Sequence, residues 1–574
     1  QYALGRALLA LGDREGARAR LEAAWAHGYR EPRVAWALAL VLGDLYREQL
    51  LMDVERRGPE QREARRRELE QRYRDPALAY LRQAEGPDVP APPLYVRALF
   101  AFYEGQHDTS LAHLEAMGRA QPWFYEAPLL KGDVLLARAT QRWHQGDAAG
   151  SQADLAAGRQ AYAIAIATAD SHPSTHSALG RLELAAFVME LYGAGDVLPH
   201  YERGVEAMSR AVAAAPDDFR AHVVLSRLHR RLAEQRARKG SPDVEALNQK
   251  AIDAALAAQA VAPPGASAAL LELAISHRQW ARYRQRQGQD PGEQLRQSID
   301  AFERVQPGER DYSFHANLGM TYQVWAEYEA EHGEDPLAHQ QKAIDAYRAA
   351  IQLREQQADA WINLGTALVR RAAWPRTPDA AGDLAAARDA LEKALSINPR
   401  NVVALFNAAD ASEQLARWRL GHGQDGAPDM ERALTLYRQG LALNDQLPQL
   451  HNGMGMTLQW QGEQRWEEGG DPEPLFTQSQ HAFEQARTVA PQQAYAYNNL
   501  GRAVDTARHV PARPSRPTPT TTWASCGHGA PRTSSRGAKT RARVSAPRWT
   551  RTNRPCGCCP ATRTSGRTSP GRTG

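Results

Sequence analysis

A small residue recurs at a nearly constant spacing along most of the chain, and this repeat restricts the possible folds more than any other feature. Successive copies are 48, 46, 48, 45, 46, 44, 46 and 46 residues apart, at Gly132, Gly180, Ser226, Ala274, Gly319, Gly365, Ala409, Gly455 and Gly501. A second apolar helical pattern follows the clearest copies, as in AIDAYRAAI at 343–351 and ARDALEKAL at 387–395. Two helical segments per period predict a stack of helical hairpins.

The copy at 361–399 resembles the tetratricopeptide repeat (TPR) family. Its first helix has a large residue, then Leu-Gly, then another apolar residue; its second has two Ala positions around a large residue, then Pro. The matching residues are Trp361, Leu364, Gly365 and Leu368, then Ala387, Leu391, Ala394 and Pro399. The resemblance covers most of residues 1–507 and implies an all-α fold, a right-handed α-solenoid of TPR-like helical hairpins whose small residues let paired helices approach closely.

The hairpins are expected to be longer than ordinary TPR units. The small positions of the two helices are 12 residues apart in the first unit (Gly5 to Ala17) but 22 to 25 apart later. In the matching segments 280–291 and 325–336, aromatic residues continue the first helix, Gly ends it, Asp caps the next helix and Pro takes its first turn. We expect helices of about 20 residues, roughly 30 Å long. The aromatic residue that extends the first helix recurs at Tyr283, Tyr328, Trp374 and Trp418.

Three parts of the chain differ in character. Residues 1–126 are an irregular TPR-like helical region that begins inside a helical pattern at Gln1, so we expect the native start to lie upstream. Residues 127–507 form the regular long-helix array. Residues 508–574 hold 14 of the 70 Lys and Arg and no Asp or Glu, which leaves 56 basic residues beside all 66 acidic ones in residues 1–507.

The segment 508–574 is predicted to be disordered. It contains no Leu, Ile, Phe, Tyr or Met, so it cannot bury enough apolar surface to offset the entropy lost on ordering. One interpretation is a natural basic tail that binds nucleic acid or acidic partners. The preferred interpretation is a frameshift in GC-rich coding DNA, which would produce this composition and cut a repeat in half.

No residue pattern predicts a catalytic residue, a cofactor site or a metal site. The G-x-G-x-x-G match at 421–426 lies between two expected helices, whereas a phosphate-binding glycine loop follows a strand, so we interpret it as a turn. The cysteines lie in the tail in a C-x-C-C arrangement without the two C-x₂-C pairs of structural zinc sites; they are Cys526, Cys556, Cys558 and Cys559. Residues 1–507 are acidic and have no apolar run near about 18 residues, which argues against nucleic-acid and membrane partners there. No small-molecule substrate is indicated.

Asparagine precedes the Leu-Gly pair or its equivalent in several copies. In TPR superhelices this resembles the asparagine ladder of the concave surface, which implies that Asn317, Asn363, Asn407 and Asn499 bind a peptide. An amide donates and accepts hydrogen bonds at once, so it can pair with the backbone of an extended peptide. The alternative is that these asparagines are ordinary repeat consensus with local hydrogen bonds only. Basic residues of a carboxylate clamp are not evident at matching positions, so a C-terminal carboxylate partner is not indicated.

The leading hypothesis is a noncatalytic protein-interaction scaffold in the cytoplasm that binds a peptide or a partner helix. Segments such as 2–25 and 129–143 also resemble the TPR region of serine/threonine protein kinases from myxobacteria-like bacteria. That resemblance implies a larger signalling protein with a kinase domain upstream of residue 1, although no kinase motif is present in this chain. Nucleic-acid binding through the basic tail is the third hypothesis.

Overall fold

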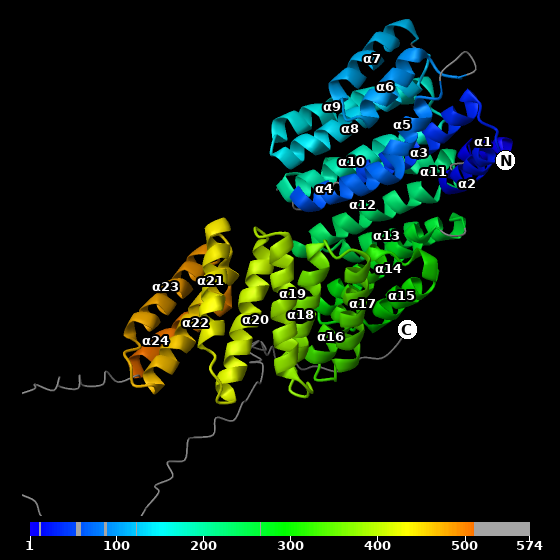
Figure 1. The fold of residues 1–574 in the computed structure, drawn as a ribbon. Coiled ribbons are helices and arrows are strands. Elements are labelled where there is room, and N and C mark those ends of the chain that lie inside the picture. The colour runs from blue at the N-terminus through cyan, green and yellow to red at the C-terminus, as the bar shows by residue number, and fades with distance from the viewer. Residues whose placement is uncertain are drawn as a thin grey trace, which may run out of the picture. The chain divides into compact units, whose positions relative to one another are not determined.

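The computed structural model describes residues 1–10, 13–52, 59–84, 89–121, 123–193, 195–263 and 266–509. All of them belong to one unit of the chain, residues 1–512. They form a succession of helices in chain order (Figure 1). The predicted tail lies outside the described residues except for its first two, which end the last helix, and the four cysteines also lie outside them.

The described residues form helical hairpins and contain no strand. The first helices of the hairpins are α1 (Tyr2–Ala10), α3 (Pro32–Met52), α6 (Pro93–Tyr103), α8 (Glu126–Gln145), α10 (Pro173–Gly193), α12 (Phe219–Arg238), α14 (Ser267–Arg286), α16 (Tyr312–Glu331), α18 (Ala358–Ala372), α20 (Val402–Gly421), α22 (Pro448–Glu467) and α24 (Ala494–His509). The second helices are α2 (Arg14–Ala26), α4 (Pro59–Leu69) continued by the π-helix η1 (Glu70–Arg74) and α5 (Asp75–Leu81), α7 (His107–Ala120), α9 (Ala148–Thr168), α11 (Leu198–Ala214), α13 (Val244–Val261), α15 (Gly292–Glu303), α17 (Leu337–Leu353), α19 (Ala380–Ile397), α21 (Ala427–Leu443) and α23 (Glu473–Val489). A 3₁₀ turn, η2 (Pro307–Glu309), links α15 to α16. The prediction of an all-α solenoid of TPR-like hairpins is confirmed.

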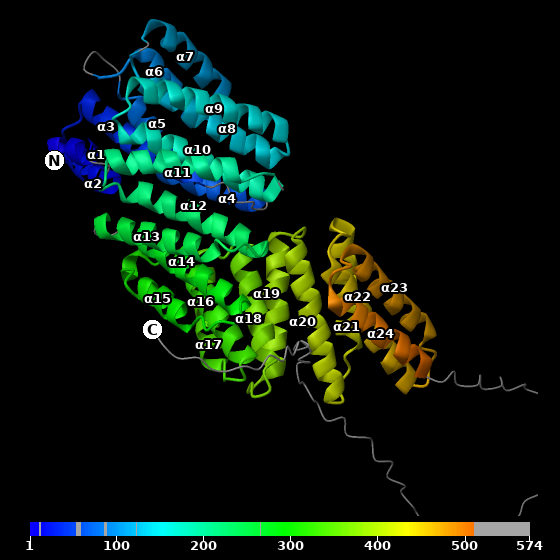
Figure 2. The ribbon, with the colours of Figure 1, turned by 180° about the vertical axis from the view of Figure 1, so that it is seen from behind.

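The helices follow the predicted period. From α10 onward the first helices begin 44 to 48 residues apart, and α10 to α14 lie beside one another in chain order from both sides of the molecule (Figure 2). Each second helix packs against its own first helix and against the first helix of the next hairpin. This nearest-neighbour packing is the arrangement expected of a solenoid.

The recurring small residue is where the first helix receives a large side chain from the second helix. A Cβ atom added to Gly132 would lie 2.3 Å from the Tyr162 ring, and one added to Gly319 would lie 2.6 Å from the ring of Tyr347. Carbon atoms in contact prefer about 3.5–4.0 Å, so these positions leave no space for a side chain. The small residue therefore recurs because the two helices of each hairpin pack closely at that position, as predicted.

The turns between the long helices form as the Gly-x-Asp-Pro pattern predicts. Gly333 has φ 76°, in the left-handed region that glycine adopts readily. The Asp335 carboxylate accepts a hydrogen bond from the Leu337 N–H at 3.1 Å, and Pro336 already has helical angles, φ −83° and ψ −4°. The segment 421–426 is the corresponding turn between α20 and α21, so the interpretation of its glycines as an interhelix turn is confirmed.

Between α8 and α23 the helices have 17 to 21 residues, close to the expected length of about 20, except for α15 and α18, which are shorter. Helix α18 has 15 residues and ends at Ala372, so the expectation that Trp374 extends it is wrong. Trp374 precedes Pro375, and the residue before a proline is disfavoured in the helical conformation. Helix α15 has 12 residues because the chain leaves it toward Pro307, where Gln306 is extended with φ −61° and ψ 143°.

Arginine–aspartate ion pairs join the two helices of several hairpins near the end of the first helix. Near the end of α18, Arg371 Nε donates to Asp383 Oδ2 of α19 at 2.7 Å. In α8 and α9, Arg138 Nε donates to Asp154 Oδ2 at 2.9 Å. The aspartates are nearly buried, and each lies in the second helix opposite the end of the first. These pairs attach the additional helical turns to each other.

Removing Arg371 should therefore loosen hairpin α18–α19. In Arg371→Ala the Asp383 carboxylate would stay buried without its cation, and we expect a loss of about 2 kcal/mol in unfolding free energy. Urea unfolding followed by circular dichroism measures this loss. The control is Arg348→Ala on α17, whose side chain is 53% exposed and lies 3.8 Å from Asp345. An equal effect of the two variants would contradict the role of the pair.

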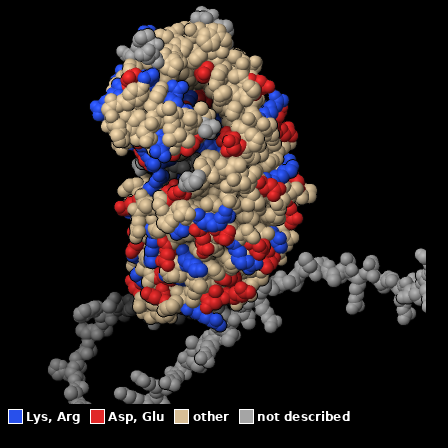
Figure 3. Space-filling view, turned by 90° about the vertical axis from the view of Figure 1, so that its right-hand side faces the viewer, with Lys and Arg blue, Asp and Glu red and all other residues tan. Residues whose placement is uncertain are grey.

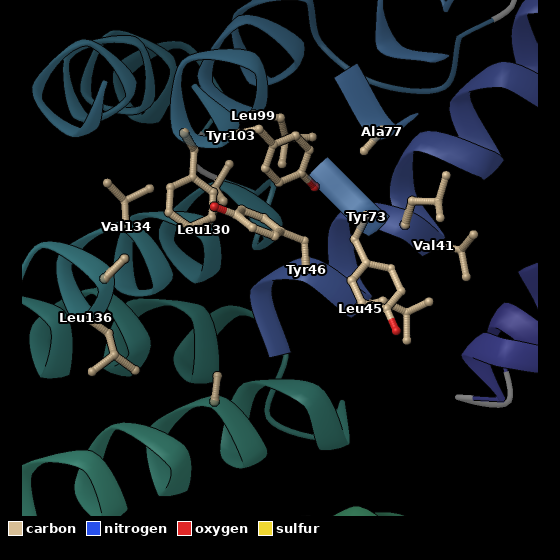
Figure 4. Close-up of a cluster of buried hydrophobic side chains, with 14 of the residues drawn as sticks. Val41, Leu45, Tyr46, Tyr73, Ala77, Leu99, Tyr103, Leu130, Val134 and Leu136 are labelled. Atoms are coloured by element: carbon tan, nitrogen blue, oxygen red, sulfur yellow. The ribbon is translucent and has the colours of Figure 1, made fainter. Parts of the chain in front are cut away.

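Helix α3 fills the centre of the N-terminal hairpins. Its Val41, Leu45 and Tyr46 pack in one cluster with side chains of η1, α5, α6 and α8 (Figure 4). The Tyr46 ring meets the Tyr103 ring of α6 edge-on, with centroids 6.1 Å apart. Helix α3 also packs on the first helices α8 and α10, and its Arg47 Nη1 donates to Asp133 Oδ2 of α8 at 2.8 Å. The first helices α8 and α10 are thus covered by a segment of the same chain.

Candidate functional site on the first helices

Neighbouring first helices pack against one another from α12 to α24 and form a continuous surface, which we name the first-helix face. Residues at equivalent positions of the repeat lie on the same side of each first helix. Hydrogen bonds between adjacent first helices identify that side. The bonded residues occupy the asparagine position, two residues before the recurring small residue, and the positions one, four and five residues after it. The four predicted peptide-binding asparagines all lie on this face, each half-buried.

Asn317 already accepts hydrogen bonds from a buried arginine. Arg278 of α14 is 7% exposed, and its guanidinium donates to the Asn317 backbone carbonyl at 2.9 Å and to Oδ1 at 3.0 Å. The Asn317 Nδ2 donates to the Ser313 carbonyl at 2.8 Å. Burial, aided by the nearby charge of Arg230, lowers the pKa of Arg278 to about 10. Asn317 therefore supplies the acceptors that a buried cation needs.

Asn407 and Asn499 each bond to the preceding first helix. Asn407 Nδ2 donates to Thr366 Oγ of α18 at 3.1 Å, and Asn499 Nδ2 donates to Asn452 Oδ1 of α22 at 2.7 Å. In both residues the Oδ1 atom has no hydrogen-bond donor among the described residues. Each of these amides keeps one acceptor while its NH₂ group joins two hairpins.

Asn363 differs from the other three asparagines. Within the described part of the chain, neither its Oδ1 nor its Nδ2 atom has a hydrogen-bond partner. It lies on α18, between Asn317 on α16 and Asn407 on α20. Asn363 thus offers both a donor and an acceptor at the middle of the series.

The position equivalent to these asparagines carries an acid in α14, which the sequence analysis missed. Glu272 is 2% exposed and accepts from Arg230 Nε at 2.6 Å and from Arg227 Nε at 3.1 Å, both on α12. Burial alone would raise the pKa of Glu272, but the two arginines hold it below its usual value. The position of Glu272 in the repeat could have identified it, because Glu272 precedes the small residue Ala274 by two residues, as Asn363 precedes Gly365.

Helix α20 places two carboxylates on the face that the sequence analysis also missed. Glu413 is 3% exposed, lies 2.6 Å from Arg417 Nη2 and accepts from Thr457 Oγ of α22 at 3.0 Å. Asp410 is half-buried, and its Oδ2 accepts from Gln414 Nε2 at 3.0 Å. Burial raises the pKa of both carboxyl groups, and the charge of Arg417 offsets this only in part.

The described residues show no alternative site. In that part of the chain, no group of three or more His, Cys, Asp and Glu side chains could hold a metal ion. A surface pocket of about 420 Å³ is lined by the α6–α7 turn and α8, but its Arg138 and Arg142 are already paired with Asp154. No described helix combines the length and apolarity that crossing a bilayer requires. Acidic and basic side chains are interspersed over the face drawn in Figure 3, without a large area of one sign.

No family model and no curated protein matches the chain. Several solved structures are similar to it in fold. The human IFIT1 dimer with m7Gppp-AAAA shares 12% identity over 81% of this chain and 94% of that chain, with a TM-score of 0.42. The APC/C hetero-tetramer Cut9-Hcn1 shares 14% identity over 88% of this chain and 95% of that chain, with a TM-score of 0.33. TTC0263, a TPR protein of Thermus thermophilus, shares 14% identity over 40% of this chain and 98% of that chain, with a TM-score of 0.28.

These likenesses concern the fold alone, so a function has to be argued from the residues of this chain. Since no family model and no curated protein matches the chain, the kinase domain upstream of residue 1 stays a hypothesis. Nucleic-acid binding by the tail falls on residues outside the described part of the chain.

Proposed function

We propose that this chain is a protein-interaction scaffold whose first-helix face binds an extended peptide across α18, α20 and α24. The hydrogen bonds of the amides carry the proposal. Among the described residues, Asn363 has no hydrogen-bond partner at Oδ1 or Nδ2, and the Oδ1 atoms of Asn407 and Asn499 accept no hydrogen bond. A peptide backbone presents alternating N–H and C=O groups, which these amides can pair with directly. The expected cytoplasmic location and the absence of catalysis belong to the same proposal.

The contacts between first helices support this use of the face. The amides at Asn407 and Asn499 are held by bonds to the preceding first helix, so their free oxygens are already oriented. Groups that are held in place before binding lose less conformational freedom when a ligand arrives. In this proposal Asn317 has a different task from the other three, because its Oδ1 atom accepts from Arg278 and its Nδ2 atom donates to Ser313.

The test is the affinity of a peptide selected from a random displayed library with the full chain as bait. Replacing Asn363 and Asn407 together by alanine should weaken binding about tenfold, which corresponds to about 1.4 kcal/mol. Fluorescence anisotropy of the labelled peptide measures the dissociation constant. The matched control is Gln439→Ala, an exposed amide on the second helix α21.

The alternative explanation makes a different prediction for the same variants. If the asparagines are repeat consensus with local bonds only, the affinity stays unchanged and only stability falls. Asn317→Ala is left out of the binding test because it would remove acceptors from buried Arg278 and destabilise the hairpin itself.

A further inference from the structure

Most ionic groups on the first-helix face between α16 and α22 are paired with each other. Arg370 of α18 forms an ion pair with Glu327 of α16, and Arg417 pairs with Glu413 within α20. Each of these two pairs has no net charge. They use both arginines that the repeat places on this part of the face, five and eight residues after a small residue.

Two carboxylates on the same face have no such partner. Among the described residues, Asp410 of α20 has no ion pair and is bonded only by the neutral amide of Gln414, through Oδ2. Within the described part of the chain, Glu463 of α22 is bonded only by the neutral amide of Gln459, at 3.0 Å. Neither carboxylate therefore has an ion pair with a described cation, although the charge of Arg417 acts on Asp410.

An exposed aromatic ring lies on the same face of α22. Trp460 is 38% exposed, although Arg417 already stacks over its ring with the guanidinium carbon 4.4 Å from the centroid. Glu463 follows Trp460 by three residues, on the same side of α22. The exposed ring offers apolar contact to the stem of a long cationic side chain that pairs with this carboxylate. Asn363, whose amide has no partner among the described residues, lies two first helices away, so groups that can recognise a peptide backbone and its side chains share one surface.

We propose that the partner bound at this face is an extended peptide with lysine or arginine side chains, which pair with Asp410 of α20 or with Glu463 of α22, one helical turn from Trp460. The inference rests on the proposed function, since it names the class of peptide that the first-helix face takes. Charge complementarity supports it: a cation supplies the charge that the two carboxylates lack, whereas an acidic peptide would add a like charge to a half-buried carboxylate. A neutral extended peptide would gain the amide contacts alone.

The experiment selects peptides from a random displayed library on the full chain and repeats the selection on the double variant Asp410→Asn with Glu463→Gln. Lysine and arginine should be enriched among the peptides selected by the native chain and not among those selected by the variant. A labelled peptide from the first selection should bind the double variant about tenfold more weakly. Its affinity for the native chain should also fall more steeply with added salt than its affinity for the variant.

The control changes the net charge equally at another place. Asp345→Asn with Asp389→Asn neutralises two exposed carboxylates on the second helices α17 and α19 and should leave the affinity unchanged. Selected peptides without basic residues would overturn the inference and leave the proposed function standing. If no peptide is selected, both fail. An equal loss in the control would show that net charge, and not this site, attracts the peptide, and would also overturn the inference.

Discussion

The Glu183→Gln variant is expected to lose about 3 kcal/mol of stability in hairpin α10–α11. The Glu183 side chain has no exposed surface and is bonded by Arg159 Nε at 2.5 Å, His200 Nδ1 at 2.8 Å and Arg203 Nε at 3.2 Å. Burial alone would raise the pKa of Glu183, but the bonds from His200 and the two arginines lower it to about 2 from the ordinary 4.5. One pKa unit corresponds to about 1.4 kcal/mol, which sets the size of the expected loss.

The same carboxylate predicts how stability depends on pH. Because its folded pKa lies below its unfolded pKa, its contribution is present above about pH 4.5 and is lost as the pH falls toward 2. Urea unfolding and hydrogen exchange at pH 7 and pH 3 should show the native chain and Glu183→Gln approaching each other at the lower pH. Glu206→Gln, at an exposed pair with Arg210 on α11, is the control and should change stability by less than about 1 kcal/mol. A pH-independent difference would contradict the assignment.

The effect of Gly319→Ala on the free energy of unfolding is expected to change sign when the Tyr347 side chain is removed. Tyr347 is fully buried, and its ring packs directly against Gly319, where there is no side chain. Its hydroxyl donates to Gln323 Oε1 at 2.8 Å. Tyr347→Ala should cost about 4 kcal/mol because it leaves a cavity. Gly319→Ala alone should cost about 2 kcal/mol because its methyl group would meet the ring. In the Tyr347→Ala background, however, Gly319→Ala should be neutral or stabilising by up to about 1 kcal/mol, since alanine favours the helix.

A double-mutant cycle in urea measures this reversal. The control is Gly501→Ala, at the equivalent position of α24, where an added Cβ meets no described atom within 4 Å. That variant should not be destabilised in either background. If Gly319→Ala costs the same with and without the tyrosine ring, the close packing of that ring is not the reason for glycine there.

Much of the array could be predicted because its rules are local. The glycine that ends a helix and the aspartate and proline that start the next one act within a few residues. The structure shows Gly333 in the left-handed conformation, Asp335 accepting from the Leu337 N–H, and Pro336 as the N-cap of α17. The exception, Trp374, also has a local cause in the following proline, which outweighed the aromatic pattern.

The partners of the site residues could not be predicted in the same way. Four asparagines with one sequence pattern have different surroundings: Asn317 accepts from Arg278, Asn407 and Asn499 donate to the preceding first helix, and Asn363 has no partner among the described residues. Each difference depends on a residue about 40 positions away on a neighbouring hairpin. The burial of Asp410 and Glu413 likewise depends on the packing of α20 against its neighbours.

The sequence by itself therefore determined the helical hairpins, their period, their turns and the positions of close contact, because periodic apolar and small residues must be buried together within each hairpin. Only the tertiary structure decided which amides are bonded, which carboxylates lack a cation, and that α3 covers α8 and α10. The physical reason is that hydrogen bonds and ion pairs between stacked hairpins depend on geometry across the stack, and the repeat pattern is the same whether or not a side chain finds its partner there.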